Sequence, residues 1–445
     1  MGRIVSKHVA SGLCTGLLLA MSVPASAAVD AKLLEMLKAN GSITAAQHSE
    51  LQAELAKEQK ETAAQKTAAA KFEEKIAWAT KTQFKGDVRL RQEITSTDGR
   101  NAAGVDDSSD QDRQRIRMRL GAYSQVNPEV DVGIRIASGS SDDRRSTNQT
   151  MEGFFTKKSI WMDQAYIDFH PEAVKNLHLI GGKMAQPWFS VADVIWDGDI
   201  NPEGLAATYK YPLGGSAELF GSAGYYNMDD NVDGEGVEFR HDTQMYTGQL
   251  GVKFAPADKV GVTLGGSVYS FDNDKLRDSN GNGIIDLATE ASALTASGNT
   301  TSEFQLWEGF GQVDFTGLAV PLSFYGQYVV NSDANDEIRV NGRDGDGGND
   351  GDTAWLVGFK TGYGKVKFDY NYRDVERNAV VGIFTDSDFA SGFTGSRGHK
   401  FKLGYDLSKN FAAGATYYMT ETDGMRGFVA DTDTDTLQLD LEAKF

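Results

Sequence analysis

The stretch QRIRMRL, residues 114–120, alternates strictly between polar and apolar side chains. Successive side chains of a β-strand point to opposite faces, so its isoleucine, methionine and leucine share one face and its three arginines share the other. The stretches VDVGIRIA (130–137) and VKFDYNYR (366–373) repeat this pattern, and the chain ends on it at LQLDLEAKF (437–445). This period of two predicts strands with one polar and one apolar face.

Working outward from this stretch, we count sixteen such segments along the chain. The predicted strands span residues 84–94, 113–125, 130–138, 160–169, 177–185, 204–211, 216–226, 243–254, 259–271, 303–315, 321–331, 353–363, 365–375, 397–407, 410–421 and 434–445. Their connections alternate between tight turns, such as NPE at residues 127–129, and long loops rich in Asp, Gly, Ser and Thr. Eight long loops on one side and seven tight turns on the other are typical of an outer-membrane barrel.

Physical chemistry explains why such a sheet has to close on itself. In hydrocarbon an open sheet edge would leave backbone polar groups without partners. One face of a closed sheet meets lipid and the other meets the interior, which is consistent with a mean hydropathy of only −0.40. A β-sandwich would need two apolar inner faces and a β-solenoid a repeat of about 20–30 residues, and we find neither. The predicted fold is all-β: a 16-stranded antiparallel transmembrane β-barrel over residues 84–445.

Composition and motifs exclude several classes of function. The 445 residues include 44 basic and 63 acidic ones, a net charge of −19, which argues against nucleic acid as a partner because duplex binding needs basic surface. There is no G-x-S-x-G, no H-E-x-x-H and no phosphate-binding loop, so we predict that the chain is not an enzyme.

The first 27 residues predict a secretory signal peptide. Arg3 and Lys7 give a positive start, an apolar stretch follows, and ASA at residues 25–27 is a small-x-small cleavage signal. The stretch is too short for a spanning helix, which needs roughly 20 apolar residues. Cleavage there removes the only cysteine, Cys14, so the mature chain has no thiol for disulfides or metal ligation.

Residues 28–80 are rich in Ala, Lys, Glu and Gln and predict a periplasmic helical segment. A second helix is expected from Ser42, after the NG break at residues 40–41. Residues at heptad spacing over 51–76 form a seam with a polar middle. A coiled coil and a solvated amphipathic helix both fit this pattern.

Six arginines fall on the polar face of the first three predicted strands. This arginine face consists of Arg89, Arg91, Arg115, Arg117, Arg119 and Arg135. Neighbouring strands lie about 4.8 Å apart, so the guanidinium groups form a dense cationic patch. Either the arginines line a water-filled interior, or they form ion pairs of the wall with carboxylates such as Glu93, Asp131 and Asp163.

The third long loop, residues 185–203, is unusually apolar for an exposed loop, with two tryptophans, a phenylalanine and two isoleucines. This composition indicates that the loop folds inward and packs against the wall. Its acidic residues are Asp193, Asp197, Asp199 and Glu203.

The stretch DSNGNGIID, residues 278–286, is similar to the start of a calcium-binding loop. The candidate ligands are Asp278, Asn280, Asn282 and Asp286. Thr289 stands where such a loop needs its closing carboxylate, so a turn-rich surface loop is the alternative interpretation. No other cofactor is predicted.

Several stretches resemble the family described as "putative porin" in Gram-negative bacteria. They are FKGDVRLRQE (84–93), DRQRIRMRLG (112–121), IASGSSDDRRSTNQT (136–150), MDQAYIDFHP (162–171), IGGKMAQPW (180–188) and IWDGDINPEG (195–204). The resemblance is densest over residues 84–210, and the helical segment before the barrel also looks like that family. It implies an outer-membrane porin, a water-filled channel for passive diffusion of small hydrophilic solutes and ions.

The resemblance carries further expectations. The third loop narrows the channel in general porins, which implies a constriction between its carboxylates and the arginine face, with a transverse electric field. It also implies a homotrimer, long loops outside the cell near lipopolysaccharide and outer-membrane lipid, and a periplasmic N-terminal segment. The final Phe445 resembles the signal that the barrel-assembly machinery reads.

A different class of function stays open at the level of the sequence. The barrel could be mainly structural, with a plugged lumen and an N-terminal helix that binds a periplasmic partner. Electrical conductance distinguishes this scaffold from a porin.

Overall fold

The structure is a computed structural model that describes residues 31–99, 106, 108–141, 143–229, 242–272, 297–301, 303–334, 339–340, 343–344, 351–424 and 431–445. The chain divides into two compact units, Met1–Ala77 and Trp78–Phe445. The predicted signal peptide and the candidate calcium ligands at residues 278–286 lie outside the described residues.

The described residues of the first unit form α1 (Ala31–Ala39) and most of α2 (Ala45–Thr80), which ends just inside the second unit. Gly41 turns the chain between them with a φ of 76°. A capping box starts α2, because the Thr44 backbone N–H donates to Gln47 Oε1 at 2.9 Å and the Gln47 N–H donates to Thr44 Oγ1 at 3.3 Å.

Contacts between α1 and α2 are few. Leu34 is buried, and His48 Nε2 lies 3.3 Å from Glu35 Oε1. On the predicted seam, Leu51 is half-buried and Phe72 is exposed. The coiled coil therefore stays a prediction. Neither helix has the length and apolarity needed to cross a membrane.

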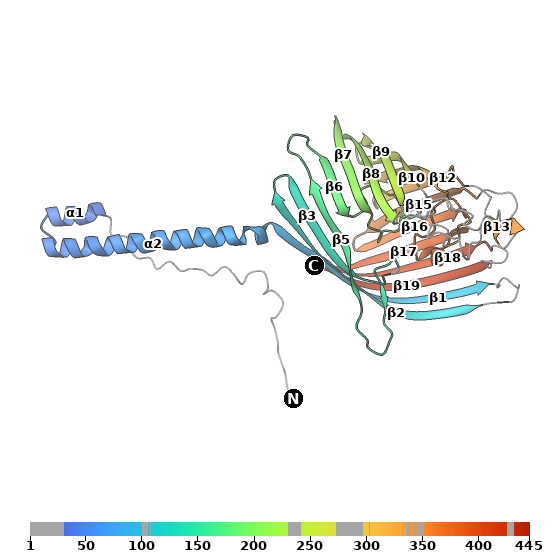
Figure 1. Ribbon diagram of the computed structural model, residues 1–445, viewed down its shortest axis with the longest axis horizontal. Coiled ribbons are helices and arrows are strands. Elements are labelled where there is room, and N and C mark those ends of the chain that lie inside the picture. Colours follow the sequence, from blue (N-terminus) through green and yellow to red (C-terminus); the bar gives the residue numbers. More distant parts are fainter. Residues whose placement is uncertain are drawn as a thin grey trace, which may run out of the picture. The chain divides into compact units, whose positions relative to one another are not determined.

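The second unit is a closed antiparallel β-barrel (Figure 1). The long strands of its described wall are β1 (Thr82–Gly99), β2 (Ser109–Asn127), β3 (Val130–Ser138), β5 (Ile160–Phe169), β6 (Leu177–Lys183), β7 (Glu203–Gly214), β8 (Ala217–Asp229), β9 (Thr243–Ala257), β10 (Val260–Asp272), β11 (Gln305–Phe315), β12 (Leu322–Asn331), β15 (Thr353–Tyr363), β16 (Val366–Val375), β17 (Ser396–Ser408), β18 (Phe411–Thr422) and β19 (Thr432–Lys444). Each pairs with its neighbours in the chain, and β1 also pairs with β19, which closes the sheet.

Shorter elements lie in the long connections. The two-residue strand β4 (Gln149–Thr150) pairs with β2, and β13 (Arg339–Val340) pairs with β14 (Arg343–Asp344). A 3-10 turn, η2, spans Phe389–Gly392.

The predicted 16-stranded barrel is confirmed. The predicted and observed bounds of the strands agree closely except at β1 and β2. The pairing of these two strands extends beyond the predicted bounds, as far as Thr97 opposite Ser109. Residues 95–99 are polar on both faces of the strand. The alternation of polar and apolar side chains therefore stops there, although the backbone pairing continues.

Side chains alternate between the outside and the interior of the barrel. On the outer face, Leu90 lies opposite Leu441, and both are exposed. On the inner face, Arg91 lies opposite Asp440, and both join contacts described below. The polar face that the sequence predicts is therefore the inner face.

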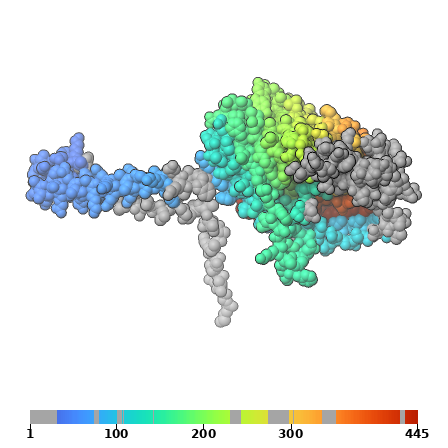
Figure 2. Space-filling view, viewed as in Figure 1, coloured from blue at the N-terminus to red at the C-terminus, as the bar shows by residue number. Residues whose placement is uncertain are grey.

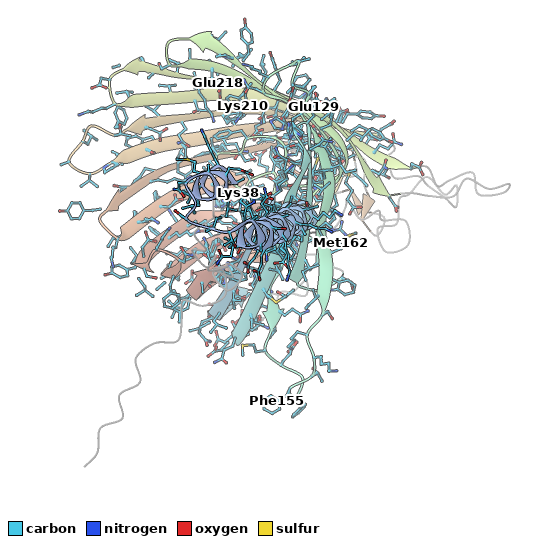
Figure 3. The ribbon with its side chains drawn as sticks, turned by 90° about the vertical axis from the view of Figure 1, so that its left-hand side faces the viewer. Lys38, Glu129, Phe155, Met162, Lys210 and Glu218 are labelled. Carbon is cyan, nitrogen blue, oxygen red and sulfur yellow. The ribbon has the colours of Figure 1, made fainter. Side chains whose placement is uncertain are left out.

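The strands of the barrel wall differ in length, and some of them are short. The strands β3 and β6 have 9 and 7 residues, whereas β2 has 19. The loop between β3 and β5 protrudes from the wall as a lobe (Figure 2), and the fully exposed Phe155 lies at its tip (Figure 3).

Candidate functional site

Two long loops pack across the barrel interior. We number the long connections L1 to L8 in chain order, so that L2 spans residues 139–159, L3 spans 184–202 and L7 spans 376–395. The apolar residues of L3 join one buried cluster with inner-face residues of the wall. The L3 members are Met184, Trp188, Val191, Val194, Ile195, Trp196 and Ile200, and wall members include Phe220, Tyr269, Leu306 and Leu356. The expected inward packing of the apolar loop is thus what its contacts show.

L7 belongs to the same cluster through Ala379, Val380, Val381, Ile383 and Phe384. Trp196 of L3 stacks on Phe384 with ring centroids 5.1 Å apart. The Asp197 N–H donates to Phe384 O at 2.6 Å, and the Asp386 N–H donates to Asp193 O at 3.2 Å. L3 and L7, the inward loops, therefore pack as one body.

Sequence reasoning missed L7. Its one available signal was the apolar run AVVGIF at residues 379–384, which stands between polar residues as the apolar run of L3 does. The run is short and follows a strand. The spacing of its apolar residues alone therefore does not distinguish it from the end of that strand.

A partly buried four-charge cluster anchors the inward loops to the wall. Arg373 of β16 donates to Asp193 Oδ1 at 2.7 Å, and Lys400 of β17 donates to Asp193 Oδ2 at 2.7 Å and to Asp386 Oδ2 at 3.0 Å. Burial alone would raise the pKa of Asp193, but Arg373 and Lys400 outweigh it and hold that pKa well below its usual range. Burial and the nearby Asp193 raise the pKa of Asp386.

Asp197 has a different environment. Its carboxylate accepts hydrogen bonds from the backbone N–H groups of Ser387 at 3.0 Å and Asp199 at 2.9 Å. Burial, and then the charge of Asp386, raise its pKa well above the usual range. Asp197 therefore links L3 to L7 through its hydrogen bonds, and its predicted place at the constriction stays a prediction.

The arginine face is largely paired with carboxylates. Arg91 Nε donates to Asp440 Oδ1 at 2.8 Å. Arg117 donates to Asp87 at 2.9 Å and to Glu442 at 2.5 Å. These partners lie on β1 and β19, beside the arginines in the wall.

Two ion pairs join the arginine face to the inward loops. Arg119 lies 3.2 Å from Asp199 of L3, and Arg91 lies 3.1 Å from Asp388 of L7. Burial would raise the pKa of Asp388, and the charge of Arg91 outweighs it, so this pKa is lowered. The gap between wall and loops is bridged at these two points.

Of the three carboxylates that were expected to form ion pairs with arginines of the wall, two lie next to an arginine. Glu93 lies 2.5 Å from Arg113, and Asp163 accepts a hydrogen bond from Arg135. Asp131 lies 3.4 Å from His170 instead. Glu203 begins β7 and pairs with Lys183 at 2.7 Å.

Arg89 and Arg115 have weaker partners. Arg89 donates to Asn148 Oδ1 at 2.7 Å, and Arg115 reaches Glu93 at 3.5 Å. No group of three His, Cys, Asp or Glu residues is arranged to hold a metal ion in the part of the chain that the structure describes.

Water reaches part of this region. The side chains of Asp388 and Arg119 keep 25% and 21% of their accessible surface. Fixed charges of opposite sign next to water act on dissolved ions through their field. The arrangement is thus suited to selection among solutes.

The family described as "Putative porin" matches residues 104–306 and 300–445. The chain belongs to this "Putative porin" family. The family and the barrel fold are those of a channel in the outer membrane of Gram-negative bacteria.

Solved structures resemble this porin in fold. OprB of Pseudomonas putida is 13% identical, with 82% of this chain and 95% of that chain covered and a TM-score of 0.51. DcaP, an outer-membrane channel of Acinetobacter baumannii, is 14% identical over 82% of this chain and 97% of that chain, with a TM-score of 0.45. OmpF of Salmonella typhi is 12% identical over 82% and 97%, with a TM-score of 0.48.

One curated relative covers a short stretch of the porin. It is named phosphate starvation-inducible protein 1, from Pseudomonas fluorescens. The two are 79% identical over 34 residues, which are 8% of this chain and 87% of the relative.

Proposed function

We propose that this porin forms a water-filled channel through which small hydrophilic solutes and ions diffuse passively, without covalent chemistry. The observation that carries the proposal is the two-sided packing of the inward loops. Their apolar side packs on the wall through residues such as Trp196, and their acidic side faces the arginine face through Asp199 and Asp388.

The proposed constriction lies between these carboxylates and the arginines. A passing solute would meet a fixed negative edge on one side and a fixed positive edge on the other. Such a transverse field orders water and orients dipolar solutes. L7 supplies part of the negative edge, which extends the constriction beyond the third loop.

Single-channel recording of the full chain in a planar lipid bilayer tests the proposal. A porin gives steady, ohmic conductance. Folded protein that inserts and yet carries no current would contradict the proposal.

Two matched variants test the charged constriction. Arg117→Gln removes a positive charge and should shift the reversal potential toward cation preference, whereas Asp388→Asn should shift it toward anion preference. Arg397→Gln is the control, because Arg397 is exposed and pairs with Glu421 at 2.8 Å, away from the arginine face. Equal reversal potentials in all three variants and the parent would rule out the constriction.

We also propose how the chain is processed and placed. Residues 1–27 would be removed, the helices within 28–80 would lie in the periplasm, and the long loops would lie outside, near lipopolysaccharide. A homotrimer would form, which chemical crosslinking in outer membranes tests through the size of the product.

Phe445 is proposed as the contact for the barrel-assembly machinery. Its backbone continues the β19–β1 pairing, with N–H and carbonyl both bonded to Gly86 at 2.9 and 3.0 Å. Its ring is 63% exposed and is therefore accessible to a partner.

A structural role with a plugged lumen is the second candidate. The contacts Arg119–Asp199 and Arg91–Asp388 favour it, because they bridge the gap that solutes would use. The recording described above distinguishes the two candidates, since a plugged barrel carries no current.

The curated relative supports one proposal about regulation. Its name describes induction by phosphate starvation, and 79% identity over 34 residues supports the same behaviour for this porin. Quantifying the protein in outer membranes from cells grown with scarce and with ample phosphate tests this. Equal amounts in both would contradict it.

A further inference from the structure

Arg89 and Arg115 differ from the rest of the arginine face in their charge pairing. Each of the other four arginines has a carboxylate oxygen at 2.8 Å or less. For Arg89 the carboxylate contact within the described residues is Asp440 at 4.0 Å, and for Arg115 it is Glu93 at 3.5 Å.

Both guanidinium groups also keep an unused hydrogen-bond donor. The Nε atoms of Arg89 and Arg115 are buried and have no partner among the residues that the structure describes. An unsatisfied buried donor on a charged group is unfavourable, and an acceptor of opposite charge relieves it. The sequence therefore retains two arginines whose donors and charges are incompletely used.

Neutral polar side chains of L2 connect the two arginines. Arg89 Nη2 donates to Asn148 Oδ1 at 2.7 Å, Asn148 Nδ2 donates to Ser146 Oγ at 3.2 Å, and Arg115 Nη2 donates to Ser146 Oγ at 3.4 Å. All three bonds end on neutral oxygens. The cluster therefore joins the two guanidinium groups through a hydroxyl and an amide, while Glu93 lies 3.5 Å from Arg115 and Asp440 lies 4.0 Å from Arg89.

Strand register brings the two arginines together. Arg89 lies opposite Arg117, and Arg115 lies opposite Arg91, so Arg89 and Arg115 are diagonal neighbours on the inner face. Diagonal neighbours on one face of a sheet lie about 7–8 Å apart and are within reach of long side chains. Their side chains keep 14% and 10% of their accessible surface, so the cluster is not sealed from water.

We propose that Arg89 and Arg115, with Ser146 and Asn148, form a binding site for a small oxyanion inside the channel. The ligand class is a compact group with two or more acceptor oxygens, such as phosphate or sulfate. Guanidinium forks match such ligands because two N–H donors meet two oxygens, which a chloride ion does not offer. The site rests on the proposed channel function and adds a solute class to it.

Block of the chloride current by inorganic phosphate tests the site. The full chain is recorded in a planar bilayer in potassium chloride, and inorganic phosphate is added in steps. We expect a saturable decrease of the chloride current in the parent protein. In Arg89→Gln and Arg115→Gln we expect the half-blocking concentration to rise about tenfold, equivalent to about 1.4 kcal/mol.

Two further variants separate the site from general charge and from folding. Asn148→Asp lies on L2 rather than on a wall strand and places a carboxylate where Arg89 now meets an amide, so it should also raise the half-blocking concentration. Lys367→Gln removes an inner-face cation that is paired with Asp406 at 2.8 Å, and it should leave the block unchanged.

The outcomes are distinguishable from those of the proposed function. A parent channel that conducts chloride but is not blocked by phosphate overturns the oxyanion site and leaves the channel standing. So does an equal block in the parent, Arg89→Gln and Asn148→Asp. Absence of any current contradicts the proposed function itself.

Discussion

At the scale of single residues, the interior of the barrel is governed by the cost of burying charge. Arg373 is completely buried and lies 2.7 Å from Asp193, which Lys400 also contacts. Removing one member of such a cluster leaves an uncompensated buried charge, which is far more costly than losing a surface ion pair. The inward loops are therefore held by charges as well as by apolar packing.

Asp197 should make the stability of the porin depend on pH. Its raised pKa means that the folded protein binds this proton more tightly than the unfolded chain, whose carboxyl pKa is about 3.9. The contribution is fully present below the unfolded pKa and is lost as the pH rises through the folded pKa.

The prediction is that Asp197→Asn weakens this dependence on pH, because the amide does not titrate. Thermal unfolding from about pH 4 to about pH 8 measures it. Asp386 has a raised pKa as well, so part of the slope should remain in the variant. Asp193 has a lowered pKa and contributes only at more acidic pH. A parent whose stability rises with pH over this range would contradict the assignment.

Gly182 is a position where only glycine fits. Its φ is +120°, and an added Cβ would lie 2.3 Å from the Ala165 carbonyl oxygen. We expect Gly182→Ala to destabilise the barrel by about 1–3 kcal/mol from backbone strain, with the steric overlap in addition.

The fraction of folded barrel, measured by its altered mobility on a gel before and after heating, reports the effect of Gly182→Ala. The matched control is Gly309→Ala in β11, because an added Cβ there meets nothing within 4 Å. The same folded fraction in both variants would refute the steric argument.

At the scale of elements, an aromatic stack links the two inward loops. Trp196 is buried and stacks on Phe384 of L7. Truncating a buried aromatic residue costs about 3–5 kcal/mol, which exceeds what loop hydrogen bonds can restore.

Trp196→Ala should therefore loosen L3 from L7 and increase both the conductance and the current noise of single channels. Phe393→Ala is the control, because Phe393 lies on the same loop L7 with 39% of its surface exposed. Noise that rises equally in both variants would show that the stack does not hold the loops.

The sequence predicts elements better than it predicts their contacts. Strict alternation, as in residues 114–120, reports the strand and its two faces directly, and the tryptophans of L3 indicate inward packing. The partners of the arginines depend on register between strands and on where loops end, and neither is local. Asp388 therefore went unnoticed, although it lies 3.1 Å from Arg91.

At the scale of the whole molecule, the barrel closes without any strand from the helical unit. The pairing of β1 with β19 begins at Asp87 opposite Lys444 and ends at Gly99 opposite Thr432. We predict that a chain lacking residues 28–80, with its signal peptide kept, still inserts and conducts with the parent's unit conductance.

Planar-bilayer recording of that shortened chain, beside the parent, measures this. A chain that inserts but loses its conductance would show that the helices take part in the channel. Normal conductance with fewer molecules in the outer membrane would assign the helices to stability or placement instead.

Closure between the first and last strands also sets the order of events during folding. The partners Arg91 and Asp440 are 349 positions apart, and contacts of such long sequence separation form slowly because the chain entropy must be lost first. Until β19 has been synthesised, both β1 and the newest strand present unpaired edges that lipid cannot satisfy. A prematurely terminated chain therefore has no stable membrane state, and its exposed edges leave it to proteolysis or aggregation before it can become a leak in the outer membrane.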